Sequence, residues 1–264
     1  MNYLIDEGCS IGKGANCTIS LLHHFLATHN LGEVSINLHA DNCSGQNKNR
    51  YVMQYLAWRV LAGLNERIEI SFMIVGHTKF APDWCFGLFK QRFRRTKVGC
   101  LADIARVVDT SAVVNTAQLV GTEDGEVIVP QYNWADYFNI FFKRTAFNGI
   151  KSLHHLVFSK EHPGIAIVRE TTDGIIKRTI KLLNKDHEQW APSRAELPPT
   201  IQPPGLSQER KEYLFEKIRE FCPPYCQDVV CPDPRDLPRS HDIVSSPPAP
   251  STPPSSPPSP KRHC

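Results

Sequence analysis

The stretch LHADNCSGQNKN, from Leu38 to Asn49, is the most informative part of this sequence. Before it, residues 34–41 alternate apolar and polar side chains, which is the pattern of a half-buried strand. After it, residues 47–64 carry apolar side chains at helical spacing. The stretch therefore predicts a corner between a strand and a helix, with Asp41 at the end of the strand.

Strands and helices continue to alternate on both sides of this corner. Apolar periodicity predicts further strands at 2–6 and 67–75, and helices at 15–29, 83–95 and 101–110. This order is typical of an α/β sheet, in which functional groups gather at the carboxyl ends of the strands. Beyond residue 110, hairpin-like patterns with Asp-Gly turns at 124–125 and 173–174 predict additional strands of a smaller lobe. We expect this region, 111–191, to be a β-rich continuation of the same domain.

Composition limits the class of protein. With 264 residues, 41% hydrophobic and 22% charged, the chain is typical of a globular protein with one sizeable core. No apolar run reaches the roughly 18 residues that a membrane helix needs. The N-terminus lacks a signal-peptide pattern, and nine scattered cysteines favour reduced thiols, so we expect an intracellular protein. A net charge of +3 gives no overall electrostatic case for nucleic acid.

The C-terminal part changes character. A Pro-rich linker is predicted at 192–205, then a helix and cysteine segment at 206–232 with Ser207 as N-cap, then a disordered Pro/Ser tail at 233–264. The tail has the PxxP spacing that protein partners of the SH3 or WW type bind. The cysteines Cys222, Cys226 and Cys231 resemble half of a zinc site, but their spacing fits no common ligand pair, so a structural role is favoured.

The polar residues at the corner suggest a metal site. Asp41, beside amide side chains and Lys48, is suited to hold a divalent cation near phosphate oxygens, because Mg²⁺ prefers hard oxygen ligands. The alternative is a polar turn that caps the next helix through Asn47 or Ser44.

A second polar block, GHTKFAPDWCF at residues 76–86, follows the next strand. It is expected to bring His77, Lys79 and Asp83 to the same sheet edge as Asp41, where two acids could hold paired metal ions. Asp83 after Pro82 is equally suited to the first turn of a helix, and the two roles are compatible.

The basic stretch FKQRFRRTK at residues 89–97 predicts an amphipathic helix. Its outer face carries cations that could contact phosphates, namely Lys90, Arg92, Arg94 and Arg95. Taken alone, this pattern is better explained as a solvated face.

Four segments, YLIDEG, GKGANCTISLLHHF, LHADNCSGQNKNRYVMQYLAWRV and GHTKFAPDWCFGLFKQRFRR, resemble a transposase-derived domain family of unknown function that is regarded as RNase H-like. The resemblance covers about residues 2–230. It implies an α/β fold with a mixed sheet, flanking helices and a small β-rich C-terminal lobe. It also implies a DDE/DDD-type site that binds Mg²⁺ or Mn²⁺, with Asp41 and Asp83 as metal ligands and catalytic acids.

Against that family pattern, the chain begins at what looks like the third strand. The first strands and the first catalytic acid are therefore expected to be missing from the partial core at 1–110, and activity is expected to be lost. His77, Lys79 and Lys48 are expected to contact nucleic acid.

Two functional hypotheses remain. The first is an RNase H-like domain that was ancestrally a metal-dependent DNA strand-transfer or nuclease enzyme. The second is a noncatalytic module that binds nucleic acid or protein through residues 90–97 and the Pro-rich tail. Neither requires a membrane or a small-molecule substrate, and a nuclear location is expected over a cytoplasmic one.

Overall fold

The computed structural model describes residues 1–29, 32–73, 81–194 and 196–235. Its helices and strands alternate in the first half of the chain, and strands dominate the middle. Their bounds are β1 Asn2–Leu4, α1 Ala15–Thr28, β2 Ser35–Ala40, α2 Arg50–Leu61, β3 Arg67–Phe72, α3 Ala81–Phe93, α4 Leu101–Asp109, β4 Ala117–Leu119, α5 Trp134–Phe141, β5 His155–Ser159, β6 Ile165–Arg169, β7 Ile176–Lys181, α6 Gln208–Tyr213 and α7 Gln227–Val230.

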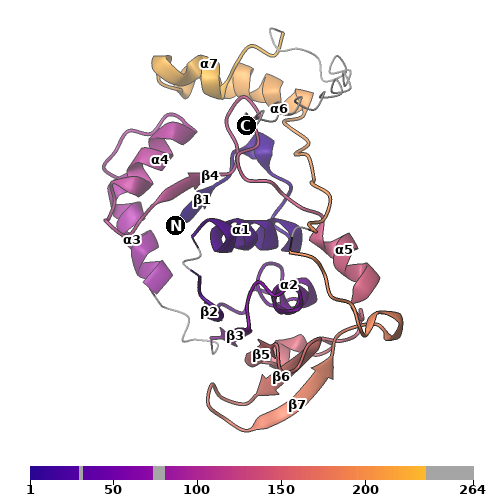
Figure 1. Ribbon diagram of the computed structural model, residues 1–264. Helices are drawn as coiled ribbons and strands as arrows, with labels where there is room; N and C mark the ends of the chain where they lie inside the picture. The colour runs from indigo at the N-terminus through magenta and orange to yellow at the C-terminus, as the bar shows by residue number, and fades with distance from the viewer. Residues whose placement is uncertain (30–31, 74–80, 195, 236–264) are drawn as a thin grey trace, which may run out of the picture.

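A five-stranded mixed sheet with the order β2-β3-β5-β6-β7 forms the centre of the fold. Strands β2 and β3 are parallel, and each later neighbour is antiparallel. Helices α1, α2 and α5 lie together on one side of this sheet (Figure 1). The mixed α/β fold with flanking helices is therefore confirmed.

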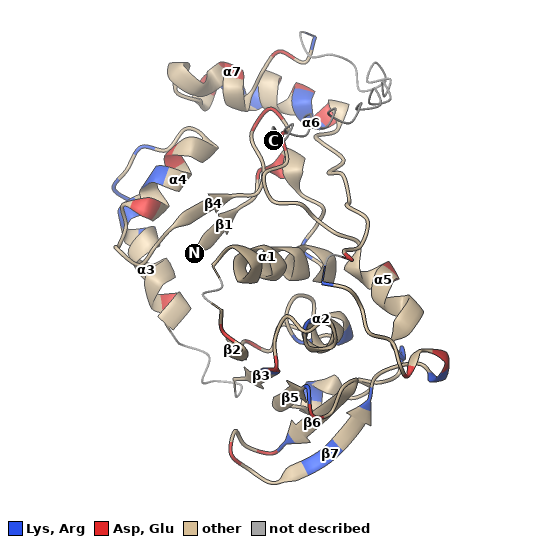
Figure 2. Cartoon of the chain, viewed as in Figure 1, with Lys and Arg blue, Asp and Glu red and all other residues tan. Residues whose placement is uncertain are grey.

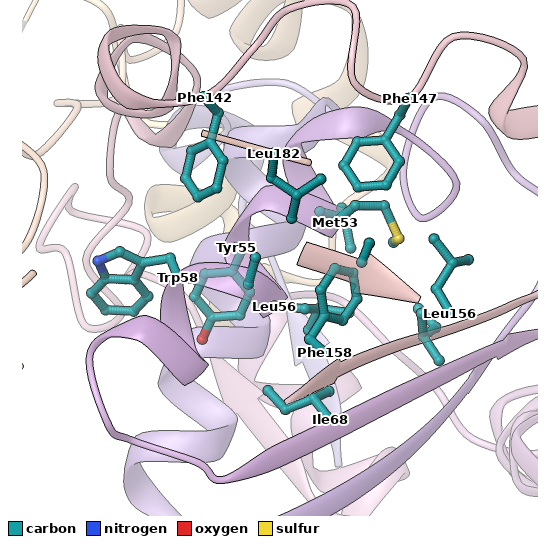
Figure 3. Packing of buried hydrophobic residues seen from close by; sticks show 14 of the residues in the cluster. Met53, Tyr55, Leu56, Trp58, Ile68, Phe142, Phe147, Leu156, Phe158 and Leu182 are labelled. Atoms are coloured by element: carbon teal, nitrogen blue, oxygen red, sulfur yellow. The ribbon is translucent and has the colours of Figure 1, made fainter. Parts of the chain in front are cut away.

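The core lies between this sheet and α2. The α2 side chains Met53, Tyr55, Leu56 and Trp58 are all fully buried. They pack with apolar residues of the sheet and of α5 and the loops beside it, many of which are drawn in Figure 3: Ile68, Phe142, Phe147, Leu156, Phe158 and Leu182. The residues of α2 from Val52 to Val60 are all buried, so packing fixes the position of this helix. The position of its N-terminus, and therefore of the corner between β2 and α2, is fixed with it.

Three predicted features differ in the structure. Strand β1 pairs with β4, in parallel, in a separate two-stranded sheet. Strands β5–β7 extend the central sheet, because β5 pairs with β3, so the strands predicted for a smaller lobe belong to that sheet. The region 111–191 also contains α5. The differences in strand pairing share a cause. Paired strands are far apart in the sequence, and the local periodicity of one strand does not indicate which other strand pairs with it. The pairing observed does not establish an RNase H-like strand order.

The Pro-rich linker is attached to the domain. The amide of Ile201 donates to the carbonyl of Gln131 at 2.6 Å, and the amide of Asn133 donates to the carbonyl of Pro199 at 2.9 Å. Beyond it, Ser207 caps α6 as predicted, by accepting from the amide of Arg210. Most of the predicted disordered tail, 236–264, lies outside the described residues. Within the described ranges, no helix is long and apolar enough to cross a membrane.

Candidate functional site

The corner, residues 41–49, connects the end of β2 to α2 through a tight hydrogen-bonded turn. The Asp41 carboxylate lies at the strand end, as predicted. Its Oδ1 accepts from the amide of Cys43 at 3.0 Å and from the side-chain amide of Asn47 at 2.7 Å. One oxygen of the carboxylate that the sequence assigns to metal binding therefore stabilises the turn that follows β2.

Lys48 is buried at the base of the corner, with 2% of its surface exposed. Its ammonium donates to Oδ1 of Asn42 at 2.8 Å and to the carbonyl of Lys151 at 3.0 Å, and it lies 4.8 Å from the ring centroid of Phe72. Burial lowers the pKa of Lys48. The side chain joins three parts of the domain internally, so the phosphate contact expected of Lys48 does not agree with its position.

The remaining amides of the corner are also used internally. Asn42 donates to the carbonyl of Met73, after the end of β3. Asn49 is the N-cap of α2, since its Oδ1 accepts from the amides of Tyr51 at 3.0 Å and Val52 at 3.1 Å. The alternative prediction, a polar turn that caps α2, therefore agrees with the structure in the role of the turn. The capping residue differs, because it is Asn49 and not Asn47 or Ser44.

The second predicted block is only partly described. His77 and Lys79 lie outside the described residues, so their contacts stay predictions. Asp83 lies in the first turn of α3 and is exposed. In the described ranges, no group of three or more His, Cys, Asp or Glu side chains is arranged to hold a metal ion. A site that combines Asp41 and Asp83 stays a prediction.

The α3 segment, residues 81–97, contains the basic stretch that the sequence predicted to form a helix. The predicted cations Lys90, Arg92, Arg94 and Arg95 are all exposed, and no side chain of α3 is buried. Figure 2 shows basic residues gathered where α3 approaches α4. The helix differs from the amphipathic pattern in one respect, because Trp84, Phe86 and Phe93 of α3 are also exposed.

Those aromatic side chains are large. Trp84 is 63% exposed, Phe86 46% and Phe93 42%. The ammonium of Lys90 lies 4.7 Å from the ring centroid of Phe86, so a cation and an aromatic face share one part of this surface. One hydrogen bond joins the helix to the loop before β4: the side-chain amide of Asn115 donates to the carbonyl of Cys85 at 3.0 Å.

Sequence reasoning missed a cleft of about 620 Å³ on the side of the molecule that carries β1 and β4. Segments distant in sequence line it, which are 5–9, 98–104, 122–125, 205–214 and 229–232. At its edge, Arg210 forms an ion pair with Glu7 at 2.9 Å. Glu123 accepts from the amide of Leu101 at 2.9 Å, which satisfies a free N–H at the start of α4. No local motif could have indicated this cleft.

Asp103 joins this region to the C-terminal segment and was also missed. The carboxylate is 6% exposed and accepts from the hydroxyl of Tyr225 at 2.5 Å and from the amide of Gly99 at 3.0 Å. The hydrogen bond from Tyr225, followed by that from Gly99, lowers the pKa of Asp103 to about 2. An acid inside an ordinary amphipathic helix pattern gave no signal of this role.

Comparison with known proteins adds a family but no function. No curated protein and no solved structure matches the chain. A family described as "Domain of unknown function (DUF7869)" matches residues 4–170, a span that includes both the corner and the α3 segment. The match covers more than half of the 264 residues. The chain therefore belongs to the DUF7869 family.

Proposed function

We propose that this chain is a nucleic-acid-binding module of transposase-derived, RNase H-like ancestry, and that the α3 segment makes the principal contacts. The observation that carries the proposal is the joint exposure of aromatic and basic side chains on one helix. Solvent-exposed aromatic clusters are uncommon on surfaces that have no partner, and they mark interaction sites.

The charge of the α3 segment supports phosphate contact. Five cations occur within eight residues, at 90, 92, 94, 95 and 97, and no acidic residue occurs between Asp83 and Asp103. The local charge of this stretch, +5, therefore exceeds the net charge of +3 of the whole chain. Lys and Arg side chains that replace counterions on a nucleic-acid backbone supply binding free energy that falls as salt rises.

The aromatic side chains favour a single strand over a duplex. Bases of a single strand stack on exposed aromatic rings, at about 1–3 kcal/mol per base, whereas duplex bases are already stacked on each other. Trp84 has the most accessible ring of α3. We therefore expect single-stranded DNA or RNA to bind more tightly than the same sequence in duplex form.

The test uses the full chain and a fluorescent oligonucleotide, single-stranded or annealed, with anisotropy measured over a range of salt concentrations. The variant R92A/R94A/R95A removes three exposed cations from the α3 segment. The matched control, K177A/R178A/K181A, removes three exposed cations from β7. The α3 variant is expected to lower the slope of log K against log salt by about 2, at about 0.7 for each lost contact with a single strand. The control is expected to match wild type.

Two results would contradict the proposal. One is equal loss of binding in the α3 and β7 variants, which would mean that only overall charge matters. The other is no binding by any form at low salt. Replacement of Trp84 by Ala should weaken binding to the single strand without changing the salt slope, because the ring carries no charge.

A second candidate function is metal-dependent phosphoryl chemistry on DNA, with Asp41 and Asp83 as ligands of Mg²⁺ or Mn²⁺. It is favoured by the position of Asp41 at the carboxyl end of β2, beside the parallel strand β3. Acids at such strand ends are well placed to bind metal ions. Mn²⁺ titration followed by calorimetry separates the two candidate functions. If the metal site exists, the wild-type chain should bind Mn²⁺, and D41N and D83N should not. If oligonucleotide binding is the same with and without Mn²⁺ and in both variants, the noncatalytic module is favoured.

A further inference from the structure

Two cysteines of the C-terminal segment lie almost in contact. The sulfur atoms of Cys222 and Cys231 are 3.7 Å apart, at the two ends of a short loop that we call the thiol loop, residues 222–231. Cys222 follows a helical turn at Arg219–Phe221, and Cys231 follows α7. A disulfide requires a sulfur–sulfur distance of about 2.05 Å, so the two atoms need to approach each other by less than about 2 Å.

The backbone at both ends of the thiol loop is held in place without help from the thiols. The guanidinium of Arg219 donates to the carbonyl of Cys231 at 2.6 Å and to that of Gln227 at 3.1 Å. In return, the side-chain amide of Gln227 donates to the carbonyls of Arg219 and Cys222, each at 3.1 Å. A small rotation of the two cysteine side chains can therefore form the bond while these contacts remain.

The other nearby thiol is less suited to the reaction. Cys226 is 1% exposed, and its sulfur donates to the carbonyl of Pro223 at 3.3 Å. It also packs against Gly99, where even a Cβ atom would lie only 2.7 Å from that sulfur. Cys226 is thus held by its own turn and by Gly99, which precedes α4. Cys222 is partly accessible, so it is the thiol that an external oxidant can reach.

We propose that Cys222 and Cys231 form a dithiol site that a low-molecular-weight disulfide, of the glutathione type, converts to an intramolecular disulfide. First, the Cys222 thiolate attacks one sulfur of the external disulfide and releases one external thiolate, which takes a proton from water. The sulfur of Cys231 then loses its proton to solvent, attacks the Cys222 sulfur and displaces the second external thiol. The two cysteines are oxidised by two electrons, and the external disulfide is reduced to two thiols.

The order of attack follows from accessibility and acidity. Cys231 is fully buried, and burial together with the hydrogen bond that its thiol donates to Cys222 raises the pKa of Cys231 to about 11. Its thiol stays protonated near neutral pH, so it resolves the mixed disulfide and does not start the reaction. The second step should therefore limit the rate and speed up as pH rises.

Closing the thiol loop affects how the C-terminal segment holds the rest of the domain. Tyr225 lies inside the loop, and its hydroxyl donates to Asp103 of α4. Val229 and Val230, also inside the loop, line the cleft. A covalent closure reduces the conformations open to the unfolded segment, which stabilises the folded attachment.

The experiment oxidises the reduced full chain with oxidised glutathione, blocks remaining thiols with an alkylating agent and maps peptides without reduction. Wild type is expected to give a peptide pair joined through Cys222 and Cys231, and exposed Cys43 is expected to give only the glutathione adduct. In C231S, Cys222 should accumulate as the mixed disulfide. In C226S, the bond between Cys222 and Cys231 should still form.

Thermal unfolding provides the second readout. The oxidised wild type should unfold roughly 5 °C higher than the reduced form, with the increase reversed by dithiothreitol and absent in C231S. If C231S fails to fold, as judged by far-UV circular dichroism, C222S serves instead. A dominant bond between any other pair, or a lasting glutathione adduct on Cys222 in wild type, would overturn the proposal.

Discussion

The corner and the α3 segment are both rich in polar and charged residues, yet they use them in opposite ways. At the corner, Lys48 and Asn49 hold backbone and side-chain atoms of the domain together. In the α3 segment, the cations and Trp84 face solvent. The comparison teaches that a dense polar motif indicates either a binding surface or a structural joint, and that only burial distinguishes the two.

The largest expected difference lies between two lysines. K48A should lower the free energy of unfolding by about 2–4 kcal/mol, because it leaves a cavity at a buried position and removes the donor to Asn42 and to the carbonyl of Lys151. K90A, in the α3 segment, should change it by less than about 0.5 kcal/mol, as is usual for exposed positions. Urea unfolding of both variants measures this. Equal values would remove the distinction between the two regions.

A smaller effect separates the actual helix cap, Asn49, from Ser44, one of the two cap residues that the sequence suggested. N49A should destabilise the domain by about 1 kcal/mol through loss of the N-cap, and N49D should restore most of it. S44A is the matched control, since Ser44 is exposed and should tolerate the change. If S44A were as harmful as N49A in urea unfolding, the assignment of the cap to Asn49 would be wrong.

The pH dependence of stability provides a third comparison. Burial lowers the pKa of Lys48 in the folded state below its value in the unfolded chain. Between those two values the unfolded chain binds more protons, so the free energy of unfolding should rise with pH through that alkaline window. Subtracting the profile of K48M from that of wild type isolates this contribution. A difference profile that is flat, or that falls with pH, would contradict the burial of the charged form.

The smallest expected effect on stability is at Trp84. W84A should leave the free energy of unfolding within about 0.5 kcal/mol of wild type, because most of the side chain is already in water. It should nevertheless weaken binding of a single-stranded oligonucleotide, by about fivefold to about 150-fold for the loss of one stacked base worth about 1–3 kcal/mol. Chemical unfolding and anisotropy on the same preparation test both statements. A strongly destabilised W84A would mean that the ring packs on the domain.

Much of the local structure could be predicted because its cause is local. The alternation in residues 34–41 and the apolar stripe of 47–64 give β2 and α2 to within a few residues. The Asp-Gly turn at 173–174 correctly placed the hairpin of β6 and β7. In each case a single segment carries its own periodicity or turn chemistry, so no knowledge of its neighbours was needed.

Features that depend on distant partners could not be predicted. The pairing of β1 with β4, and of β5 with β3, joins residues more than 80 positions apart. The role of Lys48 was misjudged for the same reason, since its partner carbonyl at Lys151 is 103 residues away. Residue type alone suits Asp41 to a metal, and its hydrogen bonds with Asn47 and Cys43 become visible only in three dimensions.

The end of the central sheet at β7 has a consequence for the protein in concentrated solution. An edge strand presents unpaired backbone groups that can join a second sheet, and charged side chains are a common protection against such pairing. The basic residues Lys177, Arg178 and Lys181 are all exposed on β7, as the blue bands on that strand show (Figure 2). Mutual repulsion between these cations should keep two molecules from pairing edge to edge. Replacing them with neutral residues should therefore increase aggregation at high protein concentration, even though it should leave nucleic-acid binding unchanged.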